Sequence, residues 1–96
     1  MTETPLQSKI TKWLRSHDVY VLTTRVLPGV PVGCPDVIGL YENKWLAIEV
    51  KKGPKAPFRP GQKPTLQRLK KGNTFVYVAN PENWDIIKDE IVAQFL

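Results

Sequence analysis

Three side chains suited to act on a phosphate ester lie near the middle of this sequence. Asp36 follows Pro35, and after twelve further residues comes the run Glu49-Val50-Lys51. Phosphodiester hydrolysis requires an activated water, neutralised charge on the transition state and a stabilised leaving oxygen, all of which divalent cations can supply. Because Mg²⁺ prefers a few carboxylates plus waters and substrate phosphates, we expect it to bind Asp36 and Glu49, with the Val50 carbonyl as a third oxygen. Lys51 is expected to hold the attacking water or a phosphate oxygen.

A hairpin would bring these side chains together. Residues 36–42 and 45–52 have the composition of two strands joined by a tight connection. If the loop is Glu42-Asn43, the numbers of opposed residues sum to 85, and Asp36 faces Glu49 on one side of the hairpin. A three-residue loop would shift the register by one, and an asparagine without a following glycine leaves both registers open. The side-chain period of two sends Lys51 to the Glu49 side and makes the opposite side apolar, with Val37, Leu46, Ile48 and Val50.

Helices and two more strands are expected around this hairpin. Thr4 as N-cap and Pro5 at the first helical position open a helix that should stop near His17-Asp18. A strand over 19–26 and a Pro/Gly-rich loop over 27–35 are expected before the hairpin. After it we expect an irregular segment over 53–64, whose Pro60 can sit in a first helical turn, and a helix to about Lys71. The last expected elements are a strand over 74–79 buried on both faces and a helix opened by Asn80-Pro81-Glu82. This order of helix, three strands, helix, strand and helix predicts an α/β domain with a mixed sheet flanked by helices, in which the third and fourth strands are parallel.

Length and composition are typical of one globular domain over residues 1–96. The longest apolar runs are a few residues, so no membrane span is expected, and the start MTETPLQSK lacks the features of a secretory signal. The single cysteine, Cys34, cannot form an internal disulfide and is expected to be a small, half-buried residue with no nucleophilic role. These features predict a cytoplasmic protein.

Positive charge is concentrated in the second half of the chain. Residues 51–81 contain eight Lys or Arg and no Asp or Glu, so of the net charge of +5 this segment carries +8 and the rest −3. Such segregation suits a polyanionic partner, because neutralising phosphates releases counterions, although a solvated basic face is an equally good interpretation of charge alone. As DNA-binding residues we select Lys52, Lys55, Arg59 and Lys63.

The combination of these features resembles the PD-(D/E)xK nuclease superfamily, and within it the stand-alone VRR-NUC nucleases of phages and bacteria. The residues that carry the resemblance are Gly33-Cys34-Pro35-Asp36, Ile48-Glu49-Val50-Lys51, Gln62 with Leu69 seven positions later, Gly72, a hydrophobic strand, and Asn80-Pro81-Glu82-Asn83. The resemblance implies a restriction-endonuclease-like core and Mg²⁺-dependent cleavage, with Mn²⁺ as a substitute, of branched DNA such as Holliday junctions or flaps. It also implies a homodimer in a bacterial or phage-infected host cell.

Residue by residue, Asp36 and Glu49 match the metal-binding acids of that family and Lys51 matches its catalytic lysine. Gln62 matches the glutamine at the start of the following helix, and Gln67 is a rival with poorer spacing to Gly72. Many members carry a glutamate near the start of the first helix, and Glu3 is the one acid there. A first-turn acid favoured by the helix dipole explains Glu3 equally well.

Two other functions remain open from the sequence. One is a DNA-binding module of the same fold without catalysis, against which the complete set of Asp36, Glu49 and Lys51 argues. The other is an assembly protein with tryptophans at its interface. Helical spacing predicts core positions for Trp13 and Trp84, which leaves Trp45 as the ambiguous one.

Overall fold

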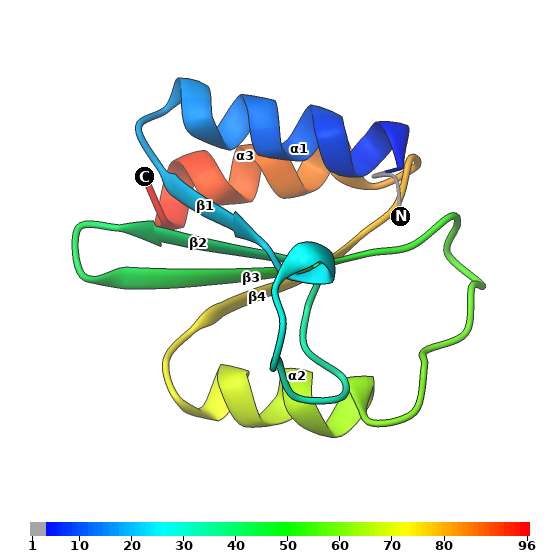
Figure 1. Cartoon of the computed structure of the whole chain (residues 1–96). Helices are drawn as coiled ribbons and strands as arrows, with labels where there is room; N and C mark the ends of the chain where they lie inside the picture. Colours follow the sequence, from blue (N-terminus) through cyan, green and yellow to red (C-terminus); the bar gives the residue numbers. More distant parts are fainter. Residues whose placement is uncertain (1–3) are drawn as a thin grey trace.

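Residues 4–96 form three helices and a four-stranded mixed sheet. A computed structural model describes residues 4–96, with every side chain in that range except that of Val26. The elements in order are α1 (Pro5–Ser16), β1 (Tyr20–Thr23), a 3₁₀ turn (Thr24–Val26), β2 (Val37–Tyr41), β3 (Lys44–Val50), α2 (Gln62–Lys71), β4 (Phe75–Ala79) and α3 (Trp84–Gln94). Helices α1 and α3 lie on one face of the sheet and α2 on the other (Figure 1). This is the small α/β domain that the element order predicts.

The strands are arranged in the order β1-β2-β3-β4. Strand β2 is antiparallel to both β1 and β3, whereas β4 is parallel to β3 and is reached through α2. The predicted parallel pairing of the third and fourth strands is therefore confirmed. Of the strands, β1 and β4 are the two edges, and β2 and β3 form the centre of the sheet.

The hairpin of β2 and β3 has the shorter of the two possible loops. Tyr41 pairs with Lys44 and Val37 with Ile48, so opposed residue numbers sum to 85. Glu42 and Asn43 both have positive φ, 45° and 67°, which is the backbone required in a two-residue hairpin turn of the I′ type. The register that places Asp36 opposite Glu49 is thus confirmed.

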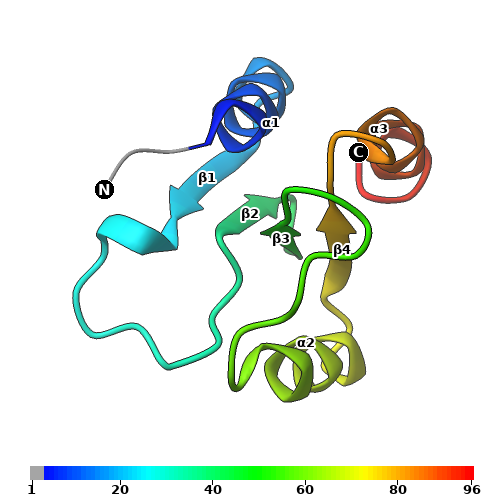
Figure 2. The same ribbon diagram turned by 90° about the vertical axis from the view of Figure 1, so that its right-hand side faces the viewer.

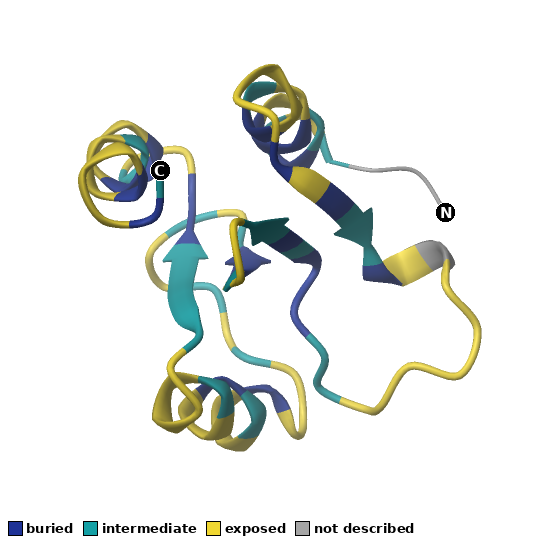
Figure 3. Cartoon of the chain, turned by 90° about the vertical axis from the view of Figure 1, so that its left-hand side faces the viewer, coloured by how far each residue is buried: buried dark blue, intermediate teal, exposed yellow. Residues whose placement is uncertain are grey.

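The apolar side of this hairpin packs under α1 and α3. Val37, Leu46 and Ile48 are fully buried, and Val50 is 8% exposed. They form one cluster with Ile10 and Leu14 of α1, with Ile87 and Ile91 of α3, and with Trp84 and Phe95 at the two ends of α3. Figure 3 shows buried residues on the inward sides of the helices and exposed residues along their outer sides and along the loop that follows β1. Trp13 and Trp84 belong to this core or pack against it, as predicted, whereas Trp45 is 52% exposed.

The N-terminal helix follows its sequence signals. The Thr4 side chain accepts a hydrogen bond from the Gln7 N–H, Pro5 is the first helical residue, and His17 is the C-cap. His17 is exposed, and its ring centroid lies 4.5 Å from that of Trp13. Glu3 lies outside the described residues. No helix within residues 4–96 is long and apolar enough to cross a membrane.

Four predicted boundaries or environments differ from the structure. The strand expected over 19–26 ends at Thr23, because the chain turns into a 3₁₀ helix in which the Leu27 N–H donates to the Thr24 carbonyl. The strand expected to be buried on both faces is an edge strand, and four of its five residues are only half-buried.

The other two differences concern helix starts. Pro60 lies before α2 rather than in its first turn, because Gly61, with φ 84°, turns the chain and Gln62 is the first helical residue. The last helix begins at Trp84, since the Asn80 side chain accepts the N–H groups of Glu82 and Asn83 and holds residues 80–83 in a separate turn.

Candidate active site

Asp36 and Glu49 are buried carboxylates on the α2 side of the sheet. Their exposed fractions are 1% and 2%. Asp36 lies just before β2, and its Oδ2 accepts the Val50 N–H at 2.9 Å, which ties the start of β2 to the end of β3. Glu49 Oε2 accepts a hydrogen bond of 2.6 Å from the side-chain amide of Gln62. The hairpin register and the start of α2 therefore position the two acids together.

Lys51 lies on the same side as Glu49, as the period of two predicts. Its Nζ is 3.5 Å from Glu49 Oε2 and donates to the Gln62 Oε1 at 2.8 Å and to the Pro57 carbonyl at 2.9 Å. The ammonium also lies 4.6 Å from the centre of the Phe58 ring. With only 9% of its side chain exposed, Lys51 is held in one place by these contacts.

Gln62 joins the acid to the lysine. It is the first residue of α2 and fully buried, and its amide nitrogen donates to Glu49 while its amide oxygen accepts from Lys51 and from the Arg59 N–H. All three hydrogen bonds require the same orientation of the amide group. The structure therefore brings together Asp36, Glu49, Lys51 and Gln62, all four selected from the sequence, while Gln67 is exposed on the outer side of α2.

Two arginines complete the surroundings of the carboxylates. Arg25 Nε lies 3.3 Å from Asp36 Oδ1, and Arg59 Nη2 lies 3.5 Å from the same oxygen and 3.8 Å from Glu49 Oε2. Sequence reasoning missed Arg25, and it assigned Arg59 to DNA without its contact to the acids. A weak signal for Arg25 existed, since the pairing of β1 with β2 places Thr23 opposite Val37 and so brings residue 25 near Asp36.

The ionised form of Glu49 is disfavoured at this site. Burial, and then the nearby Asp36 carboxylate, raise the pKa of Glu49, against the opposing effects of the Gln62 hydrogen bond and of Lys51 and Arg59. Its second oxygen, Oε1, is buried and has no hydrogen-bond partner among the described residues. A buried carboxylate oxygen of this kind is a favourable ligand for a cation.

The two carboxylates fit Mg²⁺ as part of its coordination shell, with other ligands completing it. Within residues 4–96, no group of three or more His, Cys, Asp or Glu side chains comes together, so the protein ligands would be the two carboxylates. Mg²⁺ is commonly held by one or two carboxylates with waters and substrate phosphates completing the octahedron. Val50 lines the adjoining cleft, and its carbonyl is a candidate third ligand.

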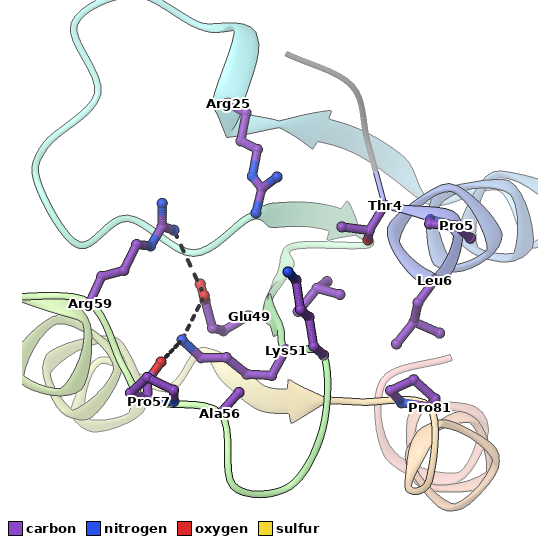
Figure 4. Close-up of a pocket in the computed structure, with 12 residues that line it drawn as sticks. Thr4, Pro5, Leu6, Arg25, Glu49, Lys51, Ala56, Pro57, Arg59 and Pro81 are labelled. Carbon is purple, nitrogen blue, oxygen red and sulfur yellow. Dashed lines mark hydrogen bonds and ion pairs between the residues drawn. The ribbon is translucent and has the colours of Figure 1, made fainter.

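A cleft of about 520 Å³ opens over Glu49 and Lys51 (Figure 4). Its other walls come from the start of α1, from the loop after β3 and from Pro81, with the lining residues Thr4, Pro5, Leu6, Arg25, Val50, Lys52, Ala56, Pro57 and Arg59. Because Thr4 and Pro5 belong to this wall, the chain next to Glu3 reaches the cleft. The position of Glu3 itself is not described.

A second cleft of about 500 Å³ lies on the Asp36 side, under the loop 27–35. Arg25 and Arg59 line both clefts, so the two arginines stand at their junction, beside the carboxylates. Figure 2 shows the loop 27–35 dipping to the α2 side of the sheet before it enters β2, and the loop 53–61 passing the strands and descending to the start of α2. They touch at Gly33, where the backbone of Gly61 leaves no room for a side chain.

The remaining basic residues selected from the sequence are exposed around this site. Lys52 lines the first cleft, Lys55 follows on the same loop, and Lys63 lies in the first turn of α2 with its Nζ 5.5 Å from the Phe58 ring. Cys34 lines the second cleft and is half-buried, as expected, and burial raises the pKa of its thiol.

Comparison of the chain with protein-family models, with curated proteins and with solved structures gives no match. The function must therefore be argued from the site.

Proposed function

We propose that this protein is a Mg²⁺-dependent endonuclease with a restriction-endonuclease-like core of the VRR-NUC type, and that it cleaves branched DNA. The observation that carries the proposal is the contact network of Glu49, Lys51 and Gln62 beside the buried Asp36. Mn²⁺ would substitute for Mg²⁺. A homodimer, and action in the cytoplasm of a bacterial or phage-infected cell, belong to the same proposal.

The two carboxylates would hold the divalent cation, which supplies charge neutralisation and water activation for phosphodiester hydrolysis. Asp36 is fixed for this by the Val50 N–H, and Glu49 by Gln62, so neither carboxylate has to reorganise when the cation binds. Glu49 Oε1 gives the cation an oxygen that no donor among the described residues already uses. Glu3, which lies outside the described residues, is kept in the proposal as a further acid.

Lys51 would act on the scissile phosphate or on the attacking water. Two of its three N–H groups point to Pro57 and Gln62, and the ammonium remains beside the oxygen of Glu49. An ammonium held in this way neutralises negative charge that develops on a phosphate oxygen without moving. Gln62 is best described as a positioning residue, because it acts through Glu49 and Lys51.

The basic surroundings suit a DNA backbone. Arg25, Arg59 and Lys52 line the first cleft, and Lys55 and Lys63 extend the positive surface from the loop into α2. Lysine and arginine contacts to phosphates give binding without base readout, so recognition by shape, as in a branched substrate, fits a domain of this size.

The test is incubation of the protein with a labelled four-way junction, a flap, a linear duplex and single strands, each with Mg²⁺ and with EDTA. We expect Mg²⁺-dependent cleavage of the branched substrates that falls by about a thousandfold or more in Asp36→Ala, Glu49→Ala and Lys51→Ala. Lys12→Ala, an exposed position on α1, is the matched control and should cleave normally. Circular dichroism of every variant checks that the fold is intact.

Three results would contradict parts of the proposal. Cleavage that survives Glu49→Ala would exclude the mechanism. A linear duplex cut as readily as the junction would exclude the substrate class while leaving the nuclease. DNA binding without any cleavage, with Mg²⁺ or with Mn²⁺, would favour the non-catalytic DNA-binding module.

A further inference from the structure

Arg59 reaches both carboxylates of the candidate site. Its Nη2 is 3.5 Å from Asp36 Oδ1 and 3.8 Å from Glu49 Oε2, and Figure 4 shows its side chain extending to Glu49 from the loop after β3. Arg25, in contrast, reaches Asp36 alone. A cation bound by Asp36 and Glu49 would draw on the same oxygens that Arg59 neutralises.

The Arg59 side chain can leave this position without unfolding its loop. It is 58% exposed, whereas Asp36 and Glu49 are buried, so the guanidinium approaches the acids from the solvent side. Its backbone is held independently, because the Arg59 N–H donates to Gln62 Oε1 at 2.8 Å and the neighbouring Pro57 carbonyl accepts from Lys51. Loss of the two long ion pairs therefore leaves the loop attached to the site.

A divalent cation has two advantages over the guanidinium at these oxygens. It carries twice the charge in a much smaller volume, and it can use Glu49 Oε1, which has no hydrogen-bond partner within the part of the chain that the structure describes. Once bound, it repels the guanidinium. Arg59 also lines both clefts, so a displaced guanidinium remains at their junction, where a strand that passes from one cleft to the other would place its backbone.

We propose that Arg59 is shared between two partners: it neutralises Asp36 and Glu49 before the divalent cation binds, and afterwards it binds a phosphate of the DNA strand. This inference rests on the proposed function and adds to it a coupling between cation and DNA. By thermodynamic linkage, the cation strengthens DNA binding through Arg59, and DNA strengthens cation binding by the same factor.

The first test measures Mn²⁺ affinity by isothermal titration calorimetry without DNA. Arg59→Gln should bind Mn²⁺ about fivefold more tightly than the wild type, since the cation no longer displaces ion pairs that are partly exposed. Lys52→Gln is the matched control, because Lys52 lines the same cleft and its loss removes the same charge. We expect less than a twofold change for Lys52→Gln. Equal tightening in both variants, or none in Arg59→Gln, would overturn the inference.

The second test measures affinity for a labelled four-way junction by fluorescence anisotropy, with EDTA or with Ca²⁺, and a gel confirms that the DNA stays intact. Ca²⁺ should strengthen binding to the wild type, and most of that gain should disappear in Arg59→Gln. The same gain in both proteins would show that Arg59 is not the link.

The two proposals fail in different ways. If wild-type protein shows no Mn²⁺ binding that Asp36→Ala abolishes, the proposed metal site is wrong and the sharing of Arg59 falls with it. If Asp36-dependent Mn²⁺ binding is present and Arg59→Gln leaves it unchanged, only the role of Arg59 is wrong.

Discussion

Strands β2 and β3 present opposite chemistry to the two faces of the sheet. Under α1 and α3, Val37, Leu46 and Ile48 are fully buried in an apolar cluster. On the α2 side, β3 holds Glu49, Lys51 follows its end, and Asp36 lies just before β2. These side chains contact Gln62, backbone groups and two arginines. Alternating residues of one strand thus serve two purposes.

The contrast separates residues that stabilise the fold from residues that would perform chemistry. Burial of an aliphatic side chain contributes free energy directly, about 25 cal/mol for each Å² removed from water. Burial of a carboxylate costs free energy, which partners only partly offset. The raised pKa of Glu49 is the sign of such a cost, and its origin is burial first and the Asp36 charge second. Residues kept at a cost to stability are typical of functional sites.

The largest stability effect expected from this comparison is on the apolar face. Ile48→Ala should lower the free energy of unfolding by about 3 kcal/mol, because it removes buried methyl groups and leaves a cavity beneath α1 and α3. Urea denaturation followed by tryptophan fluorescence measures the change. Cleavage per folded molecule should remain close to wild type, since Ile48 points away from Glu49. Ile48→Val is the milder companion, with an expected cost of about 1 kcal/mol.

A small stability change in Ile48→Ala, or a loss of cleavage as complete as that of Glu49→Ala, would show that the two faces are not independent.

The sequence predicts the apolar face and the contacts of the carboxylates better than it predicts the arginines. Alternation depends only on local spacing and places Lys51 on the side of Glu49. The sequence left two hairpin registers open, and the structure has the one that places Asp36 opposite Glu49. Gln62 was found through the family resemblance, because the Pro/Gly-rich segment before it gives no periodic signal.

The contacts of Arg25 and Arg59 to the carboxylates were missed for a different reason. Each is placed by a segment without regular spacing, the 3₁₀ turn after β1 and the loop before α2, and the path of such segments depends on tertiary contacts. The strand over 74–79 was misjudged for a related reason. Its β-forming run gives the strand but not its place at the edge, which depends on the order of strands in the sheet.

The next effect concerns the contact that shapes the second cleft. Gly33 has a φ of 85°, and a Cβ there would overlap the backbone of Gly61 next to Gln62. Gly33→Ala should therefore lower the free energy of unfolding by about 2 kcal/mol, from left-handed backbone strain together with steric overlap. It should also reduce cleavage, because the start of α2 carries Gln62.

Gly29→Ala separates the two causes. Gly29 also has a positive φ, 78°, but open space surrounds its Cβ position. It should cost only the backbone strain, about 1 kcal/mol, and leave cleavage unchanged. Urea denaturation and the junction-cleavage assay measure both variants, and equal effects at the two glycines would refute a role for the contact between the loops.

The smallest effect is a pH dependence of stability that belongs to the α2 side alone. The folded protein raises the pKa of Glu49 above its ordinary value of 4.5, so between that value and the folded pKa the folded state binds more protons than the unfolded state. The free energy of unfolding should therefore fall as the pH rises through this window, in EDTA.

Glu49→Gln keeps the shape of the side chain and removes the ionisation, so its stability should fall less over the same pH range. Urea denaturation at a series of pH values compares the two proteins, with Glu82→Gln at an exposed position as the control for loss of one carboxylate. Identical pH profiles for wild type and Glu49→Gln would mean that Glu49 ionises as easily in the folded chain as in the unfolded one, and that the buried acid carries no cost for a cation to relieve.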